Sequence, residues 1–249
     1  MAVACTQCGA SIVPRAGERL LECSYCDTAL VVDGSATLFN EVMIPTVPVD
    51  QVPAHLRRFL GGSSTVADLD KKARLGEPDL EYFPFWAFTV VGKGGERVVL
   101  EPAAPSSLQG LQGLELPAGS TRPMDREVTG EVPVAEPEVP VETARAWLVE
   151  RHGEVEILQT VLYHLPMYRT PYSWQGKTYR AAVDAVSGKV FPADFPAKAE
   201  APFVGVAVLA LIVFWLEGLV IQNLFVKAVV MLMSAIPILG IAWLTSRKV

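Results

Sequence analysis

All four cysteines of this 249-residue chain lie within its first 26 residues, as two CxxC pairs, Cys5 with Cys8 and Cys23 with Cys26. Fourteen residues separate the pairs, which is typical of a structural zinc site with four thiolate ligands. Thiolates that bind zinc need a reducing environment, so we expect this end of the chain in the cytosol. Four thiolates also complete the tetrahedral shell, so the one predicted zinc ion has no open position for a substrate.

Residues 1–34 are therefore predicted to fold as a zinc ribbon. Each CxxC pair can form a tight turn around the metal, with Gly9 and Asp27 in the left-handed backbone conformation that such a turn needs. Short strands are predicted at residues 10–13, 19–22 and 29–32. The segment is too short to bury a sufficient core, so zinc binding would supply its folding free energy. A redox-active CxxC pair and two structural disulfides are less favoured, because neither a βαβ pattern nor a signal peptide accompanies the cysteines.

The two CxxC pairs resemble the zinc ribbons of transcription factors and of many bacterial membrane proteins. The charge of this ribbon disfavours nucleic-acid binding, because a basic footprint is missing. Arg15 and Arg19 are its only cations, and they face four acidic residues, Glu18, Glu22, Asp27 and Asp33.

The C-terminal end has a membrane-like composition. Residues 203–221 are apolar except for Glu217, and residues 224–244 are apolar except for Lys227 and Ser234. Each stretch is close to the roughly 20 residues that cross a bilayer. We predict a two-helix transmembrane hairpin over residues 203–244, in which Glu217 and Lys227 lie at equal depth. They either pair with each other or extend separately to the lipid head groups.

The cations flanking these stretches predict the orientation of the hairpin. Lys189 and Lys198 precede the first stretch, and Arg247 and Lys248 follow the second. The positive-inside rule then places both termini in the cytosol, in agreement with the zinc argument. We expect a protein integral to the cytoplasmic (inner) membrane.

Residues 38–200 are predicted to form a soluble α+β domain with an internal duplication. The copies span about residues 45–100 and 139–192, and residues 101–138 connect them. Each copy contains Val-Pro-Val, a short amphipathic helix, an apolar strand with a proline, a turn and a second strand. The helices are predicted at 54–60 and 143–149, the first strands at 80–90 and 162–172, and the second strands at 92–100 and 176–185.

Two such units can pair into one antiparallel sheet of about four strands, with both helices on one face. Pro84 and Pro166 each remove a backbone donor, so an edge or a bulge is expected at these positions. The connector is rich in Pro, Gly and Glu, and its residues Leu111, Leu114 and Leu116 suggest that part of it covers the sheet.

Residues 182–190, a strand carrying Asp184 followed by Ser187, Gly188 and Lys189, resemble the hairpin of the PepSY family. That resemblance implies a small α/β module, often membrane-associated, that binds or inhibits partners. The order of ribbon, aromatic strand, hairpin and apolar end resembles uncharacterised bacterial zinc-ribbon-containing membrane proteins. This second resemblance implies no enzyme activity.

No constellation in the sequence requires catalysis. Every cysteine is used by the ribbon, and the P-loop, GxSxG, HExxH and dinucleotide glycine patterns are missing. His55, His152 and His164 are scattered and are expected to be structural or surface residues. The aromatic residues of the two strand regions are expected mainly in the core, but they are also the candidates to line any pocket. They are Phe83, Phe85, Trp86, Phe88, Tyr168, Tyr172, Trp174 and Tyr179.

These features favour a membrane-anchored, cytosol-facing adaptor or scaffold that binds protein partners and is not an enzyme. In residues 1–200 the 26 acidic residues outnumber the 18 basic ones, which disfavours contact with nucleic acid or anionic lipid. Two other functions stay open. One is a membrane-bound sensor of a small molecule or lipid, and the other is a nucleic-acid-linked regulator acting through the ribbon.

Overall fold

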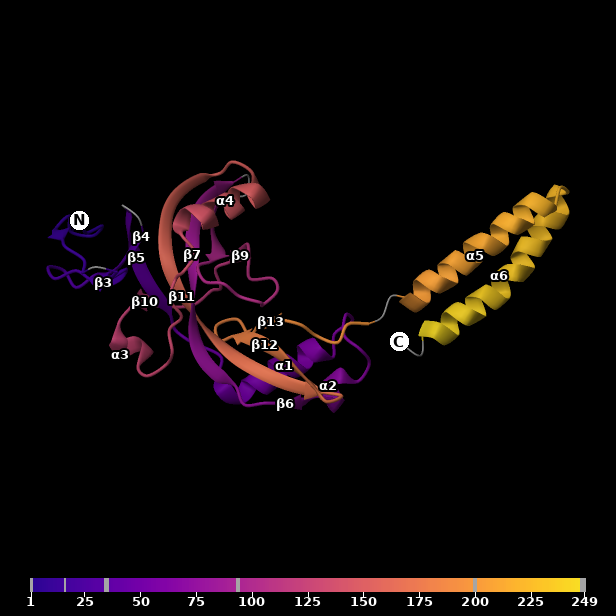
Figure 1. The fold of residues 1–249 in the computed structure, drawn as a ribbon, viewed down its shortest axis with the longest axis horizontal. Coiled ribbons are helices and arrows are strands. Elements are labelled where there is room, and N and C mark those ends of the chain that lie inside the picture. Colours follow the sequence, from indigo (N-terminus) through magenta and orange to yellow (C-terminus); the bar gives the residue numbers. More distant parts are fainter. Residues whose placement is uncertain (1, 16, 34–35, 93–94, 199–200, 247–249) are drawn as a thin grey trace. The chain divides into compact units, whose positions relative to one another are not determined.

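The computed structural model describes residues 2–15, 17–33, 36–92, 95–198 and 201–246 (Figure 1). The chain divides into two compact units. The larger unit comprises Met1–Leu60 and Asp70–Phe195, and the smaller unit comprises Gly61–Leu69 and Pro196–Val249. The cysteine-bearing segment therefore belongs to the same unit as the α+β body.

The larger unit is built on a mixed sheet whose long central strands are β7 (Asp79–Gly92) and β11 (Glu156–Trp174). Eleven strands join it, with the main order β3-β4-β5-β11-β7-β8-β9. A separate small sheet pairs β1 (Val3–Ala4) with β2 (Ser11–Ile12). The other strands are β3 (Leu20–Glu22), β4 (Ala29–Asp33), β5 (Ala36–Met43), β6 (Arg74–Leu75), β8 (Gly95–Pro102), β9 (Leu114–Glu115), β10 (Thr121–Pro123), β12 (Lys177–Asp184) and β13 (Val190–Pro192).

This sheet is larger than the four antiparallel strands predicted, and it contains a parallel pair. β5 runs parallel to β11, with Val42 opposite His164, and β4 pairs antiparallel with β5. The ribbon strands β3 and β4 thereby extend the sheet of the body. Local sequence could not show this, because β5 is a short strand whose partner lies far along the chain.

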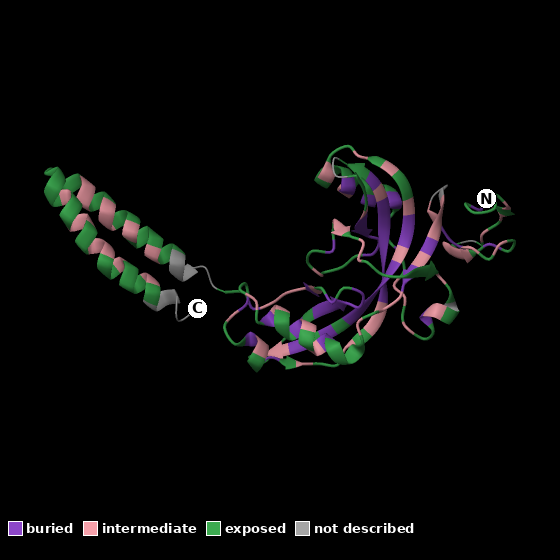
Figure 2. Ribbon diagram, turned by 180° about the vertical axis from the view of Figure 1, so that it is seen from behind, coloured by how far each residue is buried: buried purple, intermediate pink, exposed green. Residues whose placement is uncertain are grey.

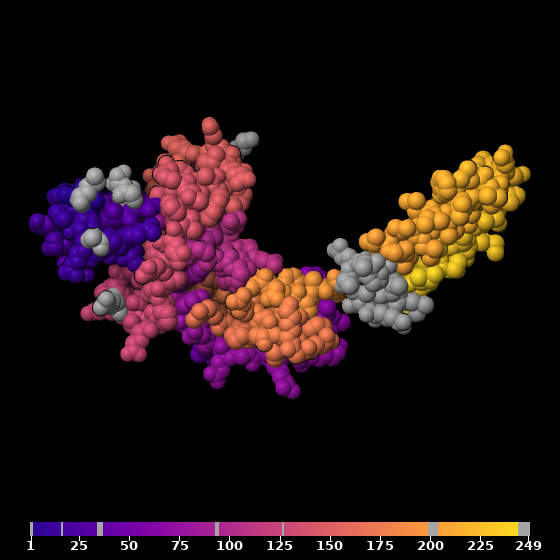
Figure 3. Space-filling model, viewed as in Figure 1, coloured from indigo at the N-terminus to yellow at the C-terminus, as the bar shows by residue number. Residues whose placement is uncertain are grey.

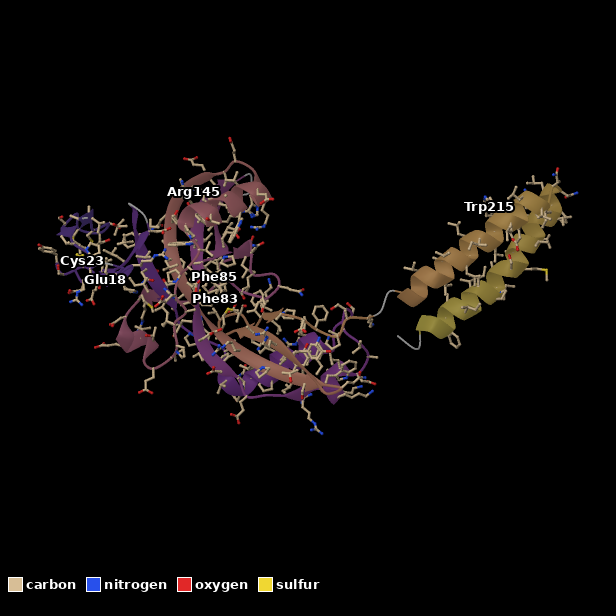
Figure 4. All side chains as sticks on the ribbon, viewed as in Figure 1. Glu18, Cys23, Phe83, Phe85, Arg145 and Trp215 are labelled. Carbon is tan, nitrogen blue, oxygen red and sulfur yellow. The ribbon has the colours of Figure 1, made fainter. Side chains whose placement is uncertain are left out.

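The strand β7 separates two apolar cores. Trp86 and Phe88 enter the core beneath the helix α4 (Val141–His152), whereas Phe83 and Phe85 enter the core on the opposite face. Successive residues of a strand point to opposite faces, so an uninterrupted apolar run is the sequence of a strand buried on both sides. Figure 2 shows this burial along the centre of the sheet, and Figure 4 labels Phe83 and Phe85.

Two helices cover one face of the sheet at opposite ends of β11. The helix α4 packs against the core that contains Leu162, and α1 (Val52–Leu60) packs against the core that contains Tyr168. Leu162 and Tyr168 are separated by an even number of residues and so share a face. The short helices η1 (Val49–Gln51), α2 (Leu69–Lys72) and α3 (Arg126–Thr129) lie in connections.

The opposite face is covered by part of the predicted connector. Leu111 is buried in the core with Phe83 and Phe85, and Leu114 and Leu116 pack against that core. The prediction that these leucines cover the sheet is confirmed.

Pro84 and Pro166 occupy positions that the sequence did not suggest. Both lie within the central strands, opposite His164 and Tyr82, and the register shift of this strand pair lies elsewhere, between Ile157 and Gln159. The predicted edge or bulge at the prolines is therefore wrong.

The neighbouring backbone explains why prolines are tolerated there. The carbonyl of Pro84 accepts from Ala103 N–H, and the carbonyl of Ala103 accepts from Val139 N–H. A residue in a strand directs its N–H and C=O to the same side, so a donor at position 84 would compete with Val139 for the Ala103 carbonyl. Proline has no such donor, and the chain leading into α4 takes its place.

The smaller unit contains two apolar helices, α5 (Ala201–Val220) and α6 (Leu224–Ser246), which lie side by side (Figure 1). Asn223 caps α6, because its Oδ1 accepts from Phe225 N–H at 3.0 Å and from Val226 N–H at 3.2 Å. Within α6, Leu224–Trp243 is long and apolar enough to cross a membrane, with a mean hydropathy of 2.3, and α5 has the shorter apolar stretch Val204–Val220.

The predicted ion pair between Glu217 and Lys227 is not formed in the described part of the chain. Lys227 Nζ donates to the carbonyl of Gly218 at 2.8 Å, and Ser234 Oγ donates to Glu217 Oε2 at 3.2 Å. Side chains on a helix lean toward its N-terminus. On two neighbouring helices that run in opposite directions, the side chains of Glu217 and Lys227 therefore lean away from each other.

Candidate metal centre

The two CxxC turns have the same backbone structure. The N–H of Gly9 donates to the carbonyl of Cys5, and the N–H of Asp27 donates to the carbonyl of Cys23, each at 2.9 Å. Gly9 has φ 72° and Asp27 has φ 56°, so the predicted left-handed conformation is confirmed at both positions. Each turn thereby presents its two thiols on one side.

The four thiol sulfurs converge at one point. All lie within 4.8 Å of one another, and the pairs Cys5–Cys26 and Cys8–Cys23 are each separated by 3.7 Å. In a tetrahedral zinc–thiolate centre with Zn–S bonds of about 2.3 Å, the sulfurs lie roughly 3.8 Å apart. The cluster is therefore compatible with one zinc ion held by Cys5, Cys8, Cys23 and Cys26.

The protonation of two of these thiols is strongly perturbed. The hydroxyl of Thr28, 3.2 Å from Cys26 Sγ, and its backbone N–H lower the pKa of Cys26 to about 6. For Cys8 the N–H of Ala10 lowers the pKa, but the neighbouring sulfurs and desolvation outweigh it and raise the pKa to about 12. A divalent cation would favour the thiolate form of all four ligands.

The metal centre has its own apolar support, which it shares with the sheet. Cys5 and Cys23 are buried with Leu30 of β4, and Ile12, Leu21 and Phe39 pack around them. On the other face of β4, Val31 belongs to the core beneath α4. One strand therefore lies between the metal centre and the body core.

A polar contact also joins the ribbon to α4. Asp33 Oδ2 accepts from Val141 N–H at 2.6 Å, and Asp33 Oδ1 accepts from Arg19 Nη2 at 3.0 Å. Pro140, the residue before α4, has no side-chain cap of its own, so a carboxylate from the ribbon caps this helix. Figure 3 shows the N-terminal segment, in indigo, against rose-coloured segments of the body.

The same contact weakens the case for nucleic-acid binding. Arg19 is engaged by Asp33 and by the carbonyl of Pro137, so one of the two ribbon cations already has partners within the chain. Glu18, labelled with Cys23 in Figure 4, accepts from the N–H of Arg15 at 2.9 Å.

The three histidines do not meet. His164 is fully buried and its Nε2 lies 2.9 Å from Asn40 Oδ1, His152 lies 3.3 Å from Arg97, and His55 packs against Gly188. Among the described residues, the cysteines form the one group of three or more His, Cys, Asp or Glu side chains arranged to hold a metal ion.

Most of the aromatic candidates lie in the core, but two line cavities. Trp86, Phe88, Tyr168, Tyr172 and Tyr179 are buried, and Trp174 is half-buried. Phe83 borders a cavity of about 810 Å³, and Phe85 borders one of about 540 Å³.

A third cavity, of about 690 Å³, was not suggested by the sequence. Its wall includes Trp147 and Arg151 of α4, and Arg151 forms an ion pair with the buried Glu101. These two charged residues lie 50 positions apart in the chain, so no local pattern connects them. The one sequence signal for this cavity was Glu101 itself, a charged residue at the end of an apolar strand.

No protein-family model matches the chain, and no curated protein or solved structure shows significant similarity to it. The candidate site therefore rests on the geometry of its own residues.

Proposed function

We propose that this protein is a membrane-anchored, cytosol-facing adaptor that binds protein partners. A zinc-stabilised ribbon and a duplicated α+β body form its soluble part, and α5 with α6 form a transmembrane hairpin. The transmembrane anchor is supported by the polarity of the helix pair, which is the reverse of that of a helix pair in water. The adaptor role draws support from the saturated thiolate shell, which leaves a bound zinc no position for catalysis.

The helix pair turns its polar groups inward and its apolar groups outward. Glu217, Lys227 and Ser234 are all half-buried, whereas Trp215 is 63% exposed and Leu224 is 82% exposed (Figure 4). A helix pair in water has the opposite arrangement. A pair in lipid favours this one, because polar groups avoid hydrocarbon and interhelical hydrogen bonds stabilise it.

The helical spacing of the half-buried residues supports a close pair. The half-buried positions of both helices recur every three or four residues and include Val206, Ala210, Val213, Phe214, Gly218, Val230, Met231, Ala235 and Ile238. We propose that α5 and α6 together cross the bilayer. Lys189 and Lys198 support a cytosolic N-terminal side, while Arg247 and Lys248 lie outside the described residues.

The sheet register supports the duplication. An offset of 82 residues converts the pairs of the β7–β8 hairpin into those of the β11–β12 hairpin. Phe85 opposite Pro102 becomes Met167 opposite Asp184. Phe83 and Leu165 are themselves related by this offset, and they lie opposite each other at the centre of the β7–β11 pair. This is expected for two copies related by an approximate two-fold axis.

The segments that precede the first strand of each copy are related by a second constant offset, of 92 residues. Each of these segments pairs with the central strand of the other copy. Val42 bridges to His164 in parallel, and its counterpart Val134 bridges to Tyr82 in parallel. Val47 N–H donates to Ala185, as Val139 N–H donates to Ala103. Each copy therefore completes the other, so the two halves form one folding unit with a single cytosolic surface.

The ribbon provides an exposed surface for a partner. Tyr25 and Val13 are each 73% exposed on it, and tyrosine is enriched at protein interfaces. Because β4 belongs to both the metal centre and the sheet, a partner held by the ribbon is held rigidly to the body.

Site-specific photocrosslinking in native membranes tests the adaptor function. We expect a crosslinker at Tyr25 to give a defined protein adduct, the Cys8→Ser variant to lose it, and a crosslinker at Trp215 to give lipid adducts. Alkaline carbonate should leave the chain in the membrane pellet. Release by carbonate would exclude the anchor, and an unchanged Tyr25 adduct without zinc would exclude docking through the folded ribbon.

The cavities favour a second function, a sensor of a small ligand. The most specific observation for it is the charged pair of Glu101 and Arg151 at the α4 cavity.

A further inference from the structure

The pair of Glu101 and Arg151 is an unusual component of the core. Glu101 is fully buried, and its Oε1 accepts from Arg151 Nη1, whereas its Oε2 has no hydrogen-bond partner among the described residues. Arg151 Nη2 also donates to Gln112 Oε1 at 3.2 Å. Burial raises the pKa of Glu101, and the charge and hydrogen bond of Arg151, with the backbone N–H of Gly113, oppose that rise.

In the other half of the body, the positions related to Glu101 and Arg151 hold uncharged residues. The strand offset of 82 residues relates Glu101 to Val183, and the helix offset of 92 residues relates Arg151 to Phe59. Val183 is fully buried, and Phe59 packs edge-on against Phe195 with ring centroids 5.6 Å apart. The two related positions therefore hold apolar side chains, of which Val183 is buried and Phe59 is half-buried.

A buried ion pair is rarely more stabilising than well-packed apolar residues at the same two positions. The cost of desolvating two charges usually equals or exceeds their attraction, so well-packed apolar replacements are often neutral or stabilising. Stability alone thus gives no reason for a charged pair at these two positions when the related positions hold apolar residues. A ligand that uses the charge does give one.

Arg151 is positioned to meet a ligand. Its side chain is 33% exposed and forms part of the wall of the cavity of about 690 Å³, together with Trp147, Leu108 and Val139. A guanidinium has five N–H donors, and the two contacts named above leave several donors free to bind an anion. The indole of Trp147 and the side chain of Leu108 form an apolar wall beside them.

The local charge favours an anion, although the soluble region as a whole is acidic. Arg97 lies 3.3 Å from His152, the residue next to Arg151. Desolvation, with Arg97 and Arg151, lowers the pKa of His152. Among the described residues that line this cavity, Arg151 is the charged one, so the wall itself carries a cation and no carboxylate.

We propose that this cavity binds a small organic carboxylate with an apolar body. The ligand carboxylate accepts from the free N–H groups of Arg151, a pairing that guanidinium geometry suits, and the hydrocarbon lies against Trp147 and Leu108. Glu101 is a positioning residue that holds the guanidinium at the wall.

The test uses the full chain in nanodiscs of zwitterionic lipid, with 2-naphthoate as the probe and neutral 2-naphthamide as its isosteric partner. Binding is measured by saturation-transfer NMR and equilibrium dialysis. We expect 2-naphthoate to bind about 10-fold or more tightly than 2-naphthamide, because the amide lacks the ionic hydrogen bonds. Arg151→Gln should remove this preference, and Arg145→Gln, an exposed change on the same helix, should not.

A double variant separates binding from stability. The double variant Glu101→Val with Arg151→Phe introduces the residue types found at the related positions, Val183 and Phe59. We expect its melting temperature to stay within about 3 °C of the unchanged chain or to rise, while carboxylate binding falls at least about 10-fold.

Three results would overturn the proposal. They are no 2-naphthoate binding by the unchanged chain up to about 1 mM, equal binding of the acid and the amide, and unaltered binding by a folded double variant. A double variant that melts far lower would likewise show that the ion pair serves the fold.

Discussion

The indole Nε1 of Trp86 donates a 2.8 Å hydrogen bond to the carbonyl of Val139. In the other half of the body, the hydroxyl of Tyr168 donates to the carbonyl of Val47 at 3.2 Å. Both bonds join a central strand to the Val-Pro-Val segment of the opposite half, and both donors lie on the face covered by helices. Each contact therefore ties a central strand to a segment that lies far from it in the chain.

These two hydrogen bonds should contribute unequally to stability. Trp86→Phe leaves a carbonyl without this donor and removes volume from a fully buried site, so we expect a loss of about 2–4 kcal/mol. Tyr168→Phe removes only the hydroxyl, with an expected loss of about 1 kcal/mol. Urea unfolding followed by near-ultraviolet circular dichroism measures both. Trp215→Phe, on the exposed face of α5, is the control and should leave the transition of the body unchanged.

The carboxylate of Asp33 should stabilise α4 across the ribbon boundary. Asp33→Ala removes the cap of Val141 and the partner of Arg19, for an expected loss of about 1–2 kcal/mol. Amide exchange should accelerate in the first turn of α4, a region distant in sequence from the change. Glu22→Ala, an exposed change on β3, should leave that exchange unaffected. Equal exchange in the two variants would contradict the capping role.

Removal of zinc should affect more than the ribbon. We expect one zinc per chain by mass spectrometry, reduced by Cys8→Ser and kept by Ser24→Ala, an exposed change between two ligands. Chelation should lower the melting temperature of the body as well, because β4 carries both the metal centre and part of the body core. A melting temperature that chelator does not change would show that the ribbon folds independently of the sheet.

Acid should destabilise the body through His164. Burial lowers the pKa of His164 to about 4, below the usual value of about 6.5. Above pH 6.5 the histidine is neutral in both states and stability is constant. Between pH 6.5 and 4 the unfolded chain takes up a proton that the folded chain excludes, so stability falls by up to about 3 kcal/mol.

His164→Gln isolates this effect, because glutamine can also donate to Asn40 and does not titrate. Denaturant unfolding at pH 7 and pH 5 should show a drop of roughly 2 kcal/mol in the unchanged chain. The variant should show a clearly smaller drop. The same drop in both chains would assign the acid sensitivity to other groups.

Two parts of this protein were predictable because their signals are local. The turns at Gly9 and Asp27 follow from CxxC spacing, and the apolar helix Leu224–Trp243 follows from composition over a single segment. The strands around Trp86 and Tyr168 were also evident, since long apolar and aromatic runs favour buried strands. In each case the residues that define the feature are neighbours in the chain.

Other features depend on partners that the sequence does not place. The parallel pairing of β5 with β11, the cap from Asp33 to Val141 and the ion pair of Glu101 with Arg151 each join segments 50 or more residues apart. Pro84 shows the difference most clearly. The missing donor was correctly identified as a constraint, but only the tertiary structure shows that the N–H of Val139 replaces it.

The sequence by itself therefore determined the four-cysteine cluster and the apolar C-terminal end, because spacing and hydropathy act over a few residues. The tertiary structure decided how the cysteine cluster joins the sheet, which distant segments pair with the central strands, and where Glu217 and Lys227 direct their side chains. Those outcomes depend on strand register and on the direction of side chains across an interface. Both are set when distant segments bury their apolar faces together.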